Sequence, residues 1–216
     1  MREVRWVLLA GLAGLLASAV FTSILHLGRP AFVGAYGLLA GLVLITFVRA
    51  HGIDFVIQVR RRWLAGIIGG LLVGGVLART VALQPGSARP EGAALGASLA
   101  WNGIVYGTID ALLLSVLPVL SIYGSRPPGT LREPVQRWTW GLAALAGSLT
   151  VTTLYHLGFA EFRGPALLQP LIGNAIITAS YLVTGNPLAA ILSHVIMHGA
   201  AVLHGAATAV QLPPHY

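Results

Sequence analysis

WLAGIIGGLLVGGVLARTVAL, residues 63–83, contains 21 residues and a single charge, on Arg79. About 20 apolar residues in a helix cross the roughly 30 Å hydrocarbon core of a bilayer. Similar runs recur along most of the 216-residue chain, in which 56% of residues are hydrophobic and 9% are charged, and there is no Cys. A soluble domain has about 25% charged residues. The composition therefore excludes a soluble enzyme, a disordered tail and a disulfide scaffold, and it predicts an all-α, polytopic helical bundle in a membrane.

The apolar runs predict a single transmembrane domain over residues 1–216 with about seven helices. Residues 1–23 have features of a signal peptide, but their apolar stretch is long for one, so we interpret them as a retained first helix. Pro118 predicts a kink or an early end in the fourth helix. The short breaker Gly185-Asn186-Pro187 predicts that the last two helices form an antiparallel hairpin. The expected helices are 6–27, 31–48, 63–83, 93–123, 138–157, 166–183 and 187–210.

The 13 basic residues are all arginines, and their distribution predicts the orientation. An excess of basic residues marks the cytoplasmic loops. We therefore predict an integral protein of a prokaryotic plasma membrane, with its amino terminus in the cytoplasm. No basic stripe interleaved with aromatic residues is present, which argues against nucleic-acid binding. The predicted cytoplasmic side holds Arg2, Arg5, Arg49, Arg60, Arg61, Arg62, Arg126, Arg132 and Arg137, and the other side holds Arg29, Arg79, Arg89 and Arg163.

Two sequence patterns concern how the helices pack. Gly66, Gly70 and Gly74 recur every four residues, a spacing that lets membrane helices approach closely. A shift of 130 residues aligns 2–28 with 132–158, with 11 of 27 positions identical. Internal repeats are common in transporters. The alignment predicts a parallel repeat, although the biased composition explains it equally well.

Asp110 is the only acidic residue deep within a predicted span. Ionisable groups inside a bilayer are costly and often functional. Asn102, Tyr106 and Asp110 follow one another at intervals of four residues, so they share one face of a helix. This stripe has two interpretations, a functional site or a set of hydrogen bonds between helices.

His194 and His198 also lie four residues apart, so two imidazoles share a helix face. Such a pair can hold one metal ion, and neutral nitrogen and oxygen ligands suit Zn²⁺ or another divalent ion. Hydrogen-bonded packing is the alternative for each histidine. Two further polar stripes follow the same spacing: Ser148, Thr152 and His156 in one helix, and Asn174, Thr178 and Tyr181 in the next.

The rise of a straight helix predicts different depths for these histidines. The estimated depth places His156 near the outer face of the membrane, level with His26 and His204, whereas His194 and His198 lie deeper. His26, His156 and His204 therefore form a rival group for a metal or a haem. Haem is the less favoured of the two cofactors.

The region 147–204 resembles the CPBP (CAAX protease and bacteriocin-processing) family of intramembrane metalloproteases. That family has Glu-Glu-x-x-x-Arg, Phe-x-x-x-His and His-x-x-x-Asn motifs on successive membrane helices. The best match runs from Gly173-Asn174-Ala175 to Leu182-Val183-Thr184-Gly185-Asn186-Pro187-Leu188 and on to Ser193-His194. The resemblance covers roughly the last four predicted helices, about half of the chain.

The resemblance implies roles for individual residues. His194 matches the family's last conserved histidine, and His198 stands at the position of its asparagine. His156 matches the histidine of Phe-x-x-x-His, with Thr152 in place of Phe. Asp110 lies at roughly the place of the Glu motif, but residues 107–115 contain no Glu pair and no Arg. The resemblance thus implies a metal-dependent hydrolase with His156, His194 and His198 as metal ligands and Asp110 as catalytic base or as a further ligand.

Other functions remain open at this stage. The missing Glu pair favours an inactive relative that serves as a membrane scaffold or a partner-binding subunit. The apparent repeat and Asp110 are compatible with a transporter, although no pair of interrupted spans supports it. The expected partners are the lipid bilayer and a membrane-protein substrate or a partner subunit, and glycine-rich helix faces leave room for an oligomer.

Overall fold

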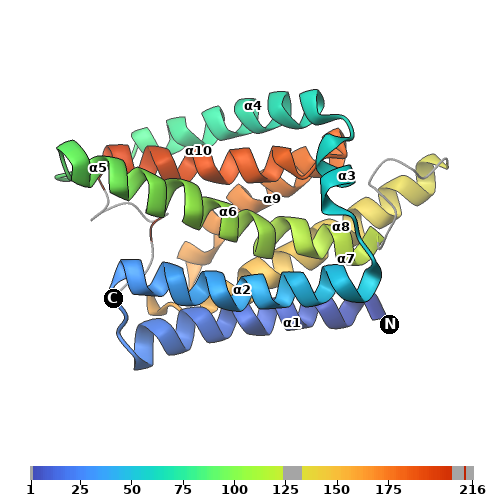
Figure 1. Cartoon of the computed structure of the whole chain (residues 1–216), viewed down its shortest axis with the longest axis horizontal. Helices are drawn as coiled ribbons and strands as arrows, with labels where there is room; N and C mark the ends of the chain where they lie inside the picture. Colours follow the sequence, from blue (N-terminus) through green and yellow to red (C-terminus); the bar gives the residue numbers. More distant parts are fainter. Residues whose placement is uncertain (1, 124–132, 206–211, 213–216) are drawn as a thin grey trace.

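The computed structural model describes residues 2–123, 133–205 and 212, and all regular structure in these residues is helical (Figure 1). The all-α prediction is therefore confirmed for this part of the chain. Arg126, Arg132 and residues 206–210 of the last predicted span lie outside the described residues. The long elements are α1 (Arg2–Leu16) with a π-helical continuation over Ala17–Ile24, α2 (Arg29–His51), α4 (Trp63–Ala82), a continuous helix over Gly92–Tyr123, α8 (Pro134–Leu157), α9 (Leu168–Thr184) and α10 (Leu188–His204).

Among the described residues, five helical stretches are long and apolar enough to cross a membrane. This finding supports an integral, multi-pass membrane protein. α10 is also apolar, but its 17 residues make it shorter than these stretches, and α8 is not among the five. Five of the seven predicted spans are therefore supported by their length and apolar composition. The five are Val4–Ile24, Arg29–His51, Trp63–Ala82, Gly92–Tyr123 and Pro165–Thr184.

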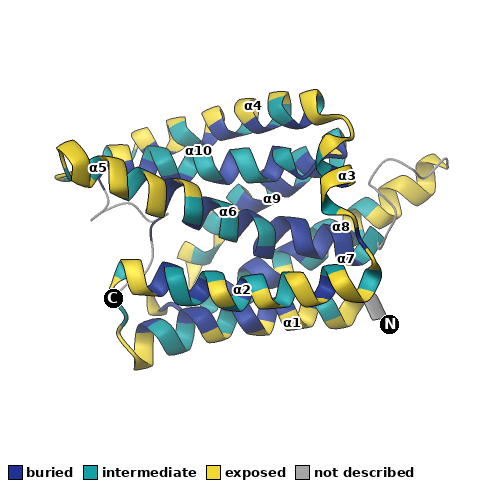
Figure 2. Cartoon of the chain, viewed as in Figure 1, coloured by how far each residue is buried: buried dark blue, intermediate teal, exposed yellow. Residues whose placement is uncertain are grey.

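The surface and the interior have the polarity expected in lipid. Leu38 on α2 and Leu72 on α4 are 79% and 67% exposed, and further apolar side chains lie exposed on the outer helices (Figure 2). Ser148 and Thr178, in contrast, are fully buried. Exposed apolar faces around a partly polar interior are favourable only where lipid replaces water. The outer faces of these helices therefore suit contact with a bilayer.

The packing of α4 on α10 confirms the role predicted for the glycine stripe. Gly66, Gly70 and Gly74 are all buried, Gly70 and Gly74 against α10 and Gly66 against Asn186 in the turn just before it. A Cβ atom on Gly70 would lie 2.6 Å from Cβ of Leu192 and 3.2 Å from the carbonyl oxygen of Ala189. The absence of side chains thus allows the two backbones to approach. Because Gly66 faces Asn186 and Gly74 faces Ile196, the two helices run parallel.

The first and the fifth long helices also pack in parallel. Gly14 of α1 lies against Tyr155 of α8. One turn further along both helices, Ser18 packs closely against Gly158. A parallel repeat would place its copies in the same direction. The repeat itself stays a prediction, because shared direction does not establish common descent of the two segments.

The turn between α9 and α10 is held by a buried asparagine. Gly185 ends α9 with a φ of 67°, in the left-handed region. Asn186 donates from Nδ2 to the carbonyl oxygen of Val59 at 2.8 Å, and its Oδ1 accepts from the backbone N–H of Leu188 at 2.8 Å. Val59 belongs to α3 (Phe55–Arg60), a short helix that the sequence analysis did not predict. α9 and α10 run in opposite directions on either side of this turn (Figure 1). The Asn186 side chain therefore links the α9–α10 hairpin to the α3–α4 connection.

Pro118 does not end the fourth helix, which continues to Tyr123 through α5 (Gly92–Ser98), α6 (Tyr106–Asp110) and α7 (Leu117–Tyr123). The expected early end is wrong because a neighbouring helix satisfies the backbone there. Proline has no N–H to bond the carbonyl four residues earlier, here that of Leu114. The Ser148 hydroxyl donates to this carbonyl oxygen at 2.7 Å.

Ser148 belongs to a buried polar network that joins α8 and α9 to the fourth helix. Asn174 donates from Nδ2 to Ser148 Oγ at 2.9 Å and to Thr152 Oγ1 at 2.6 Å. Its Oδ1 accepts from Ser115 Oγ at 2.8 Å, and Ser115 accepts from Thr178 at 3.0 Å. The predicted polar stripes on α8 and α9 thus face each other, and their side chains form hydrogen bonds between the two helices.

We expect Ser148→Ala to destabilise the fold by about 1–3 kcal/mol, because the buried Leu114 carbonyl oxygen loses its donor at 2.7 Å and keeps only a long contact, at 3.5 Å, from Asn174 Nδ2. Thermal unfolding of the protein in detergent measures the effect. Thr150→Ala is the matched control, since Thr150 lies exposed on the same helix and bonds only its own turn, at Ala146. Equal melting temperatures for the two variants would contradict the role given to Ser148.

Candidate functional site

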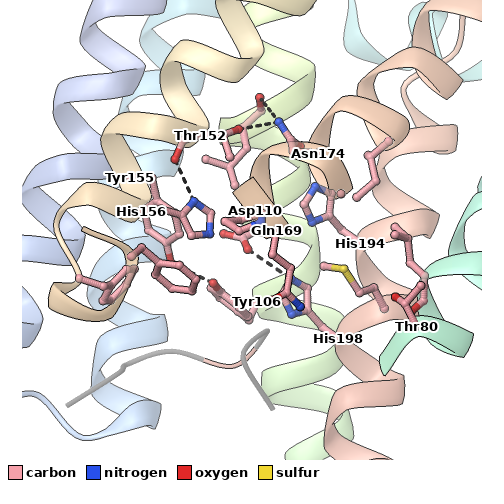
Figure 3. Close-up of a pocket in the computed structure, with 18 residues that line it drawn as sticks. Thr80, Tyr106, Asp110, Thr152, Tyr155, His156, Gln169, Asn174, His194 and His198 are labelled. Carbon is pink, nitrogen blue, oxygen red and sulfur yellow. Dashed lines mark hydrogen bonds and ion pairs between the residues drawn. The ribbon is translucent and has the colours of Figure 1, made fainter. Parts of the chain in front are cut away.

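A cavity of about 100 Å³ lies between the helices at the centre of the bundle. It receives side chains from α4, α6, α8, α9 and α10 (Figure 3). Much of its wall is apolar, from residues such as Phe159, Ile177 and Met197. Ten polar side chains also line the cavity, and all but Thr80, Tyr155 and Gln169 come from the stripes singled out in the sequence. They are Tyr106, Asp110, Thr152, Tyr155, His156, Gln169, Asn174, His194 and His198, with Thr80 at the side of α4.

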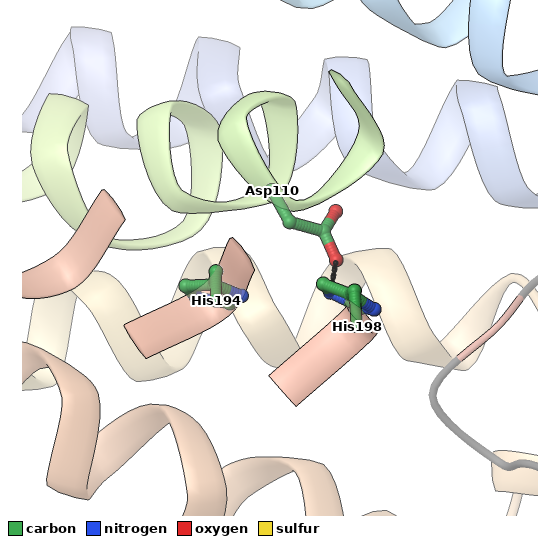
Figure 4. A group of neighbouring side chains, drawn as sticks. All are labelled: Asp110, His194 and His198. Carbon is green, nitrogen blue, oxygen red and sulfur yellow. Dashed lines mark ion pairs between the residues drawn. The ribbon is translucent and has the colours of Figure 1, made fainter. Parts of the chain in front are cut away.

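Asp110, His194 and His198 form a compact group at this cavity (Figure 4). One ligand atom from each of them lies within 4.8 Å of the other two, and all three residues are buried. Within the described part of the chain, no other group of three or more such residues comes so close. Asp110 ends α6, and the two histidines lie one turn apart on α10, so two helices supply the whole group.

The histidine rings in this group lack the partners that buried polar atoms normally have. Neither ring nitrogen of His194 and neither of His198 has a hydrogen bond within the described residues. Nε2 of His198 lies 3.2 Å from Oδ2 of Asp110, but this contact does not have hydrogen-bond geometry. Buried polar groups are nearly always hydrogen-bonded, so two buried imidazoles whose one polar contact within the described residues is with Asp110 need an explanation.

A divalent metal ion fits this donor set. Zinc bonds of about 2.0–2.1 Å in a tetrahedron place neighbouring donor atoms roughly 3.3 Å apart. The separation of 3.2 Å between His198 Nε2 and Asp110 Oδ2 agrees with that value. Two imidazoles and one carboxylate also match known catalytic zinc sites, in which the fourth position stays open. The same set suits Fe²⁺ in the two-histidine, one-carboxylate arrangement.

Three tyrosines surround Asp110. Tyr36 on α2 donates from its hydroxyl to Oδ1 of Asp110 at 3.0 Å. The hydroxyls of Tyr106 and Tyr155 bond each other at 2.9 Å, and the Tyr106 ring meets the His198 ring edge-on, with 4.6 Å between centroids. The carboxylate thus has one oxygen toward Tyr36 and the other toward His198.

His156 lines the same cavity but stands outside the group of three. Its Nδ1 lies 2.8 Å from the carbonyl oxygen of Thr152 (Figure 3). The structure therefore brings His156 to the cavity of His194 and His198, which the depths of straight helices did not predict. It places Asp110, and not His156, within ligand distance of these two residues.

The other predicted residues lie away from this group. His204 meets the carbonyl oxygen of Gln84 at 2.6 Å, and His26, His156 and His204 are not a metal-binding group within the described residues. Asn102 donates to Ser98 Oγ and does not line the cavity. Of the stripe Asn102, Tyr106 and Asp110, the last two share the cavity, and a π-helical turn over Leu99–Val105 covers the residues between Asn102 and Tyr106.

Two glycines that the sequence analysis passed over bring Asp110 close to α10. A Cβ atom on Gly107 would lie 2.9 Å from Cα of Val195, and one on Gly103 would lie 3.2 Å from Cα of Gly199. The four-residue spacing of Gly103 and Gly107 was the available signal, since small residues at this interval mark close helix contacts. Val195 follows His194 directly, so this contact sets how near the carboxylate lies to the histidines.

Comparison with known proteins adds no assignment: no family model, no curated protein and no solved structure matches this chain. The function must therefore be argued from the geometry of the cavity.

We expect Gly107→Ala to destabilise the protein by about 1–3 kcal/mol, because the added methyl group meets backbone atoms of α10 that cannot rotate away. Gly96→Ala on the same continuous helix is the control, since nothing lies within 4 Å of the added atom. That control should be neutral or slightly stabilising, because Ala favours a helix over Gly by about 0.5–1 kcal/mol. Thermal melts that fail to separate the two variants would rule out the close contact.

Proposed function

We propose that this chain is a multi-pass membrane hydrolase that binds one divalent metal ion through Asp110, His194 and His198. The observation that carries the proposal is a buried pair of imidazoles beside a carboxylate, in which, among the described residues, the polar contact of the rings is that of His198 Nε2, 3.2 Å from Asp110 Oδ2. One ion would coordinate one nitrogen of each ring and so give His194 the partner that the described residues do not provide. Zinc is our first choice among the ions that suit two nitrogens and one oxygen.

The cavity next to the group provides space for a reaction. A metal ion held there would supply Lewis-acid chemistry and an activated water molecule. His156 faces the same cavity, and its Nδ1 must carry the proton in its contact with the Thr152 carbonyl, because a carbonyl only accepts. In the neutral ring Nε2 is then a proton acceptor. We assign to His156 the transfer of a proton at Nε2.

The CPBP resemblance supports peptide-bond hydrolysis as the reaction. It matches Asp110, His156 and His194, in this order along the chain, to the family's Glu motif, its Phe-x-x-x-His motif and its His-x-x-x-Asn motif, with His198 in place of the asparagine. Asp110 differs from the family pattern, because one shorter carboxylate replaces a glutamate pair. In our proposal it acts as a metal ligand, so no second carboxylate is required beside it. By the arginine distribution, the amino terminus lies in the cytoplasm.

The first test is the metal content of the detergent-purified protein, measured by elemental mass spectrometry. We expect about one zinc-like ion per wild-type chain and a loss of most of it in His194→Ala. His51→Ala is the control, because His51 lies at the end of α2 and packs on Trp6 and Phe47, far from the cavity in the sequence and in its contacts. A wild-type protein without bound metal, even after incubation with Zn²⁺, would contradict the proposed site.

Hydrolysis is tested separately, with a library of quenched-fluorescence peptides and the metal-loaded protein. We expect cleavage that stops on chelation and resumes when Zn²⁺ is restored. Bound metal without any cleavage would leave the metal site in place and remove the hydrolase assignment.

A further inference from the structure

The two oxygens of the Asp110 carboxylate have different neighbours. Oδ1 accepts a hydrogen bond from Tyr36 at 3.0 Å, and Oδ2 lies 3.2 Å from Nε2 of His198. Tyr36 comes from α2, a helix outside the region that resembles the CPBP family. No sequence pattern pointed to Tyr36, and it does not line the cavity.

The Tyr36 side chain is held firmly in place. It is fully buried, and its ring stacks on Tyr155 with 5.2 Å between centroids and 16° between planes. Phe32 covers another side at 5.9 Å. A tyrosine with a packed ring has little freedom beyond rotation of its O–H bond, so its hydroxyl presents a donor at a fixed position.

A carboxylate can bind a metal ion through one oxygen or through both. Both oxygens can coordinate only if the carboxylate turns so that each faces the ion. The hydrogen bond from Tyr36 resists this turn, because Oδ1 would have to leave a buried donor without a partner. Groups that hydrogen-bond a ligand in this way orient it and tune its affinity.

We propose that Tyr36 is a positioning residue that makes Asp110 a one-oxygen metal ligand, through Oδ2. This inference rests on the proposed metal site. It assigns to the amino-terminal half of the chain a part in a centre whose ligands all come from the second half. It also accounts for a buried tyrosine hydroxyl that points at a carboxylate on another helix.

The test compares Zn²⁺ affinity in Tyr36→Phe and Tyr181→Phe, by competition with a chromophoric chelator. Both variants lose one buried tyrosine hydroxyl, but Tyr181 does not line the cavity and its hydroxyl has no hydrogen bond within the described residues. We expect Tyr36→Phe to bind Zn²⁺ about 10–100-fold more weakly, the usual cost of losing such a partner. Tyr181→Phe should stay within about twofold of wild type. Equal affinities for wild type and Tyr36→Phe would overturn the proposal.

A spectroscopic measurement on the wild-type protein tests the same point without a variant at Tyr36. The chain has only two aspartates, Asp54 and Asp110, so ¹³C-aspartate labelling marks both, and Asp54→Asn leaves Asp110 alone. Infrared carboxylate stretches lie far apart when one oxygen binds the metal and close together when both do. We expect the wide separation for Asp110 in the Zn²⁺-loaded protein. A narrow separation would refute one-oxygen binding, even if Tyr36→Phe does not fold.

These results also separate the inference from the proposed function. If the wild-type protein takes up no Zn²⁺, the metal site itself is wrong, and the role of Tyr36 falls with it. If it takes up Zn²⁺ with unchanged affinity in Tyr36→Phe or with the narrow infrared separation, only the role of Tyr36 is wrong.

Discussion

Polar atoms buried among membrane helices have no water to bond, so each must find a partner inside the protein. This constraint explains most of what distinguishes the interior of this chain. Around Asn174, hydroxyls and an amide hydrogen-bond one another, and the Ser148 hydroxyl also donates to the Leu114 carbonyl oxygen that Pro118 leaves without a backbone donor. At His194 and His198 the same requirement is not met by the described residues. The first cluster is therefore complete as a structural unit, and the second is incomplete in the way expected of a ligand site.

Both clusters depend on close helix contact, which glycine provides. Lipid does not drive helices together as water does, so small residues and good packing must supply the association. α10 lies between α4 and the fourth helix, with the Gly70 face on one side and the Gly107 face on the other. A bulkier residue at either face would increase the distance across which the histidines reach Asp110. The geometry of the candidate site therefore depends directly on how closely these helices pack.

The sequence predicted the helices and the key residues better than their mutual positions. Apolar length and the four-residue spacing identified Asp110, His194 and His198, since both signals lie within single helices. The place of His156 was predicted wrongly, because a depth count assumes straight helices and ignores tilt and π turns. Tyr36 was missed altogether, since its partner is 74 residues away and no local pattern links them. Contacts between helices depend on register, which a single sequence does not specify.

The position of α10 has a consequence for how the protein is made. Asp110 enters the membrane with the fourth helix, whereas its histidine neighbours are synthesised last, on the final long helix of the described chain. Until α10 inserts between α4 and the fourth helix, the carboxylate has tyrosine hydroxyls such as that of Tyr36 beside it but no histidine. The insertion machinery must therefore accept the fourth helix while its acidic side chain lacks two of its neighbours. The centre is completed only once α10 has been synthesised and inserted.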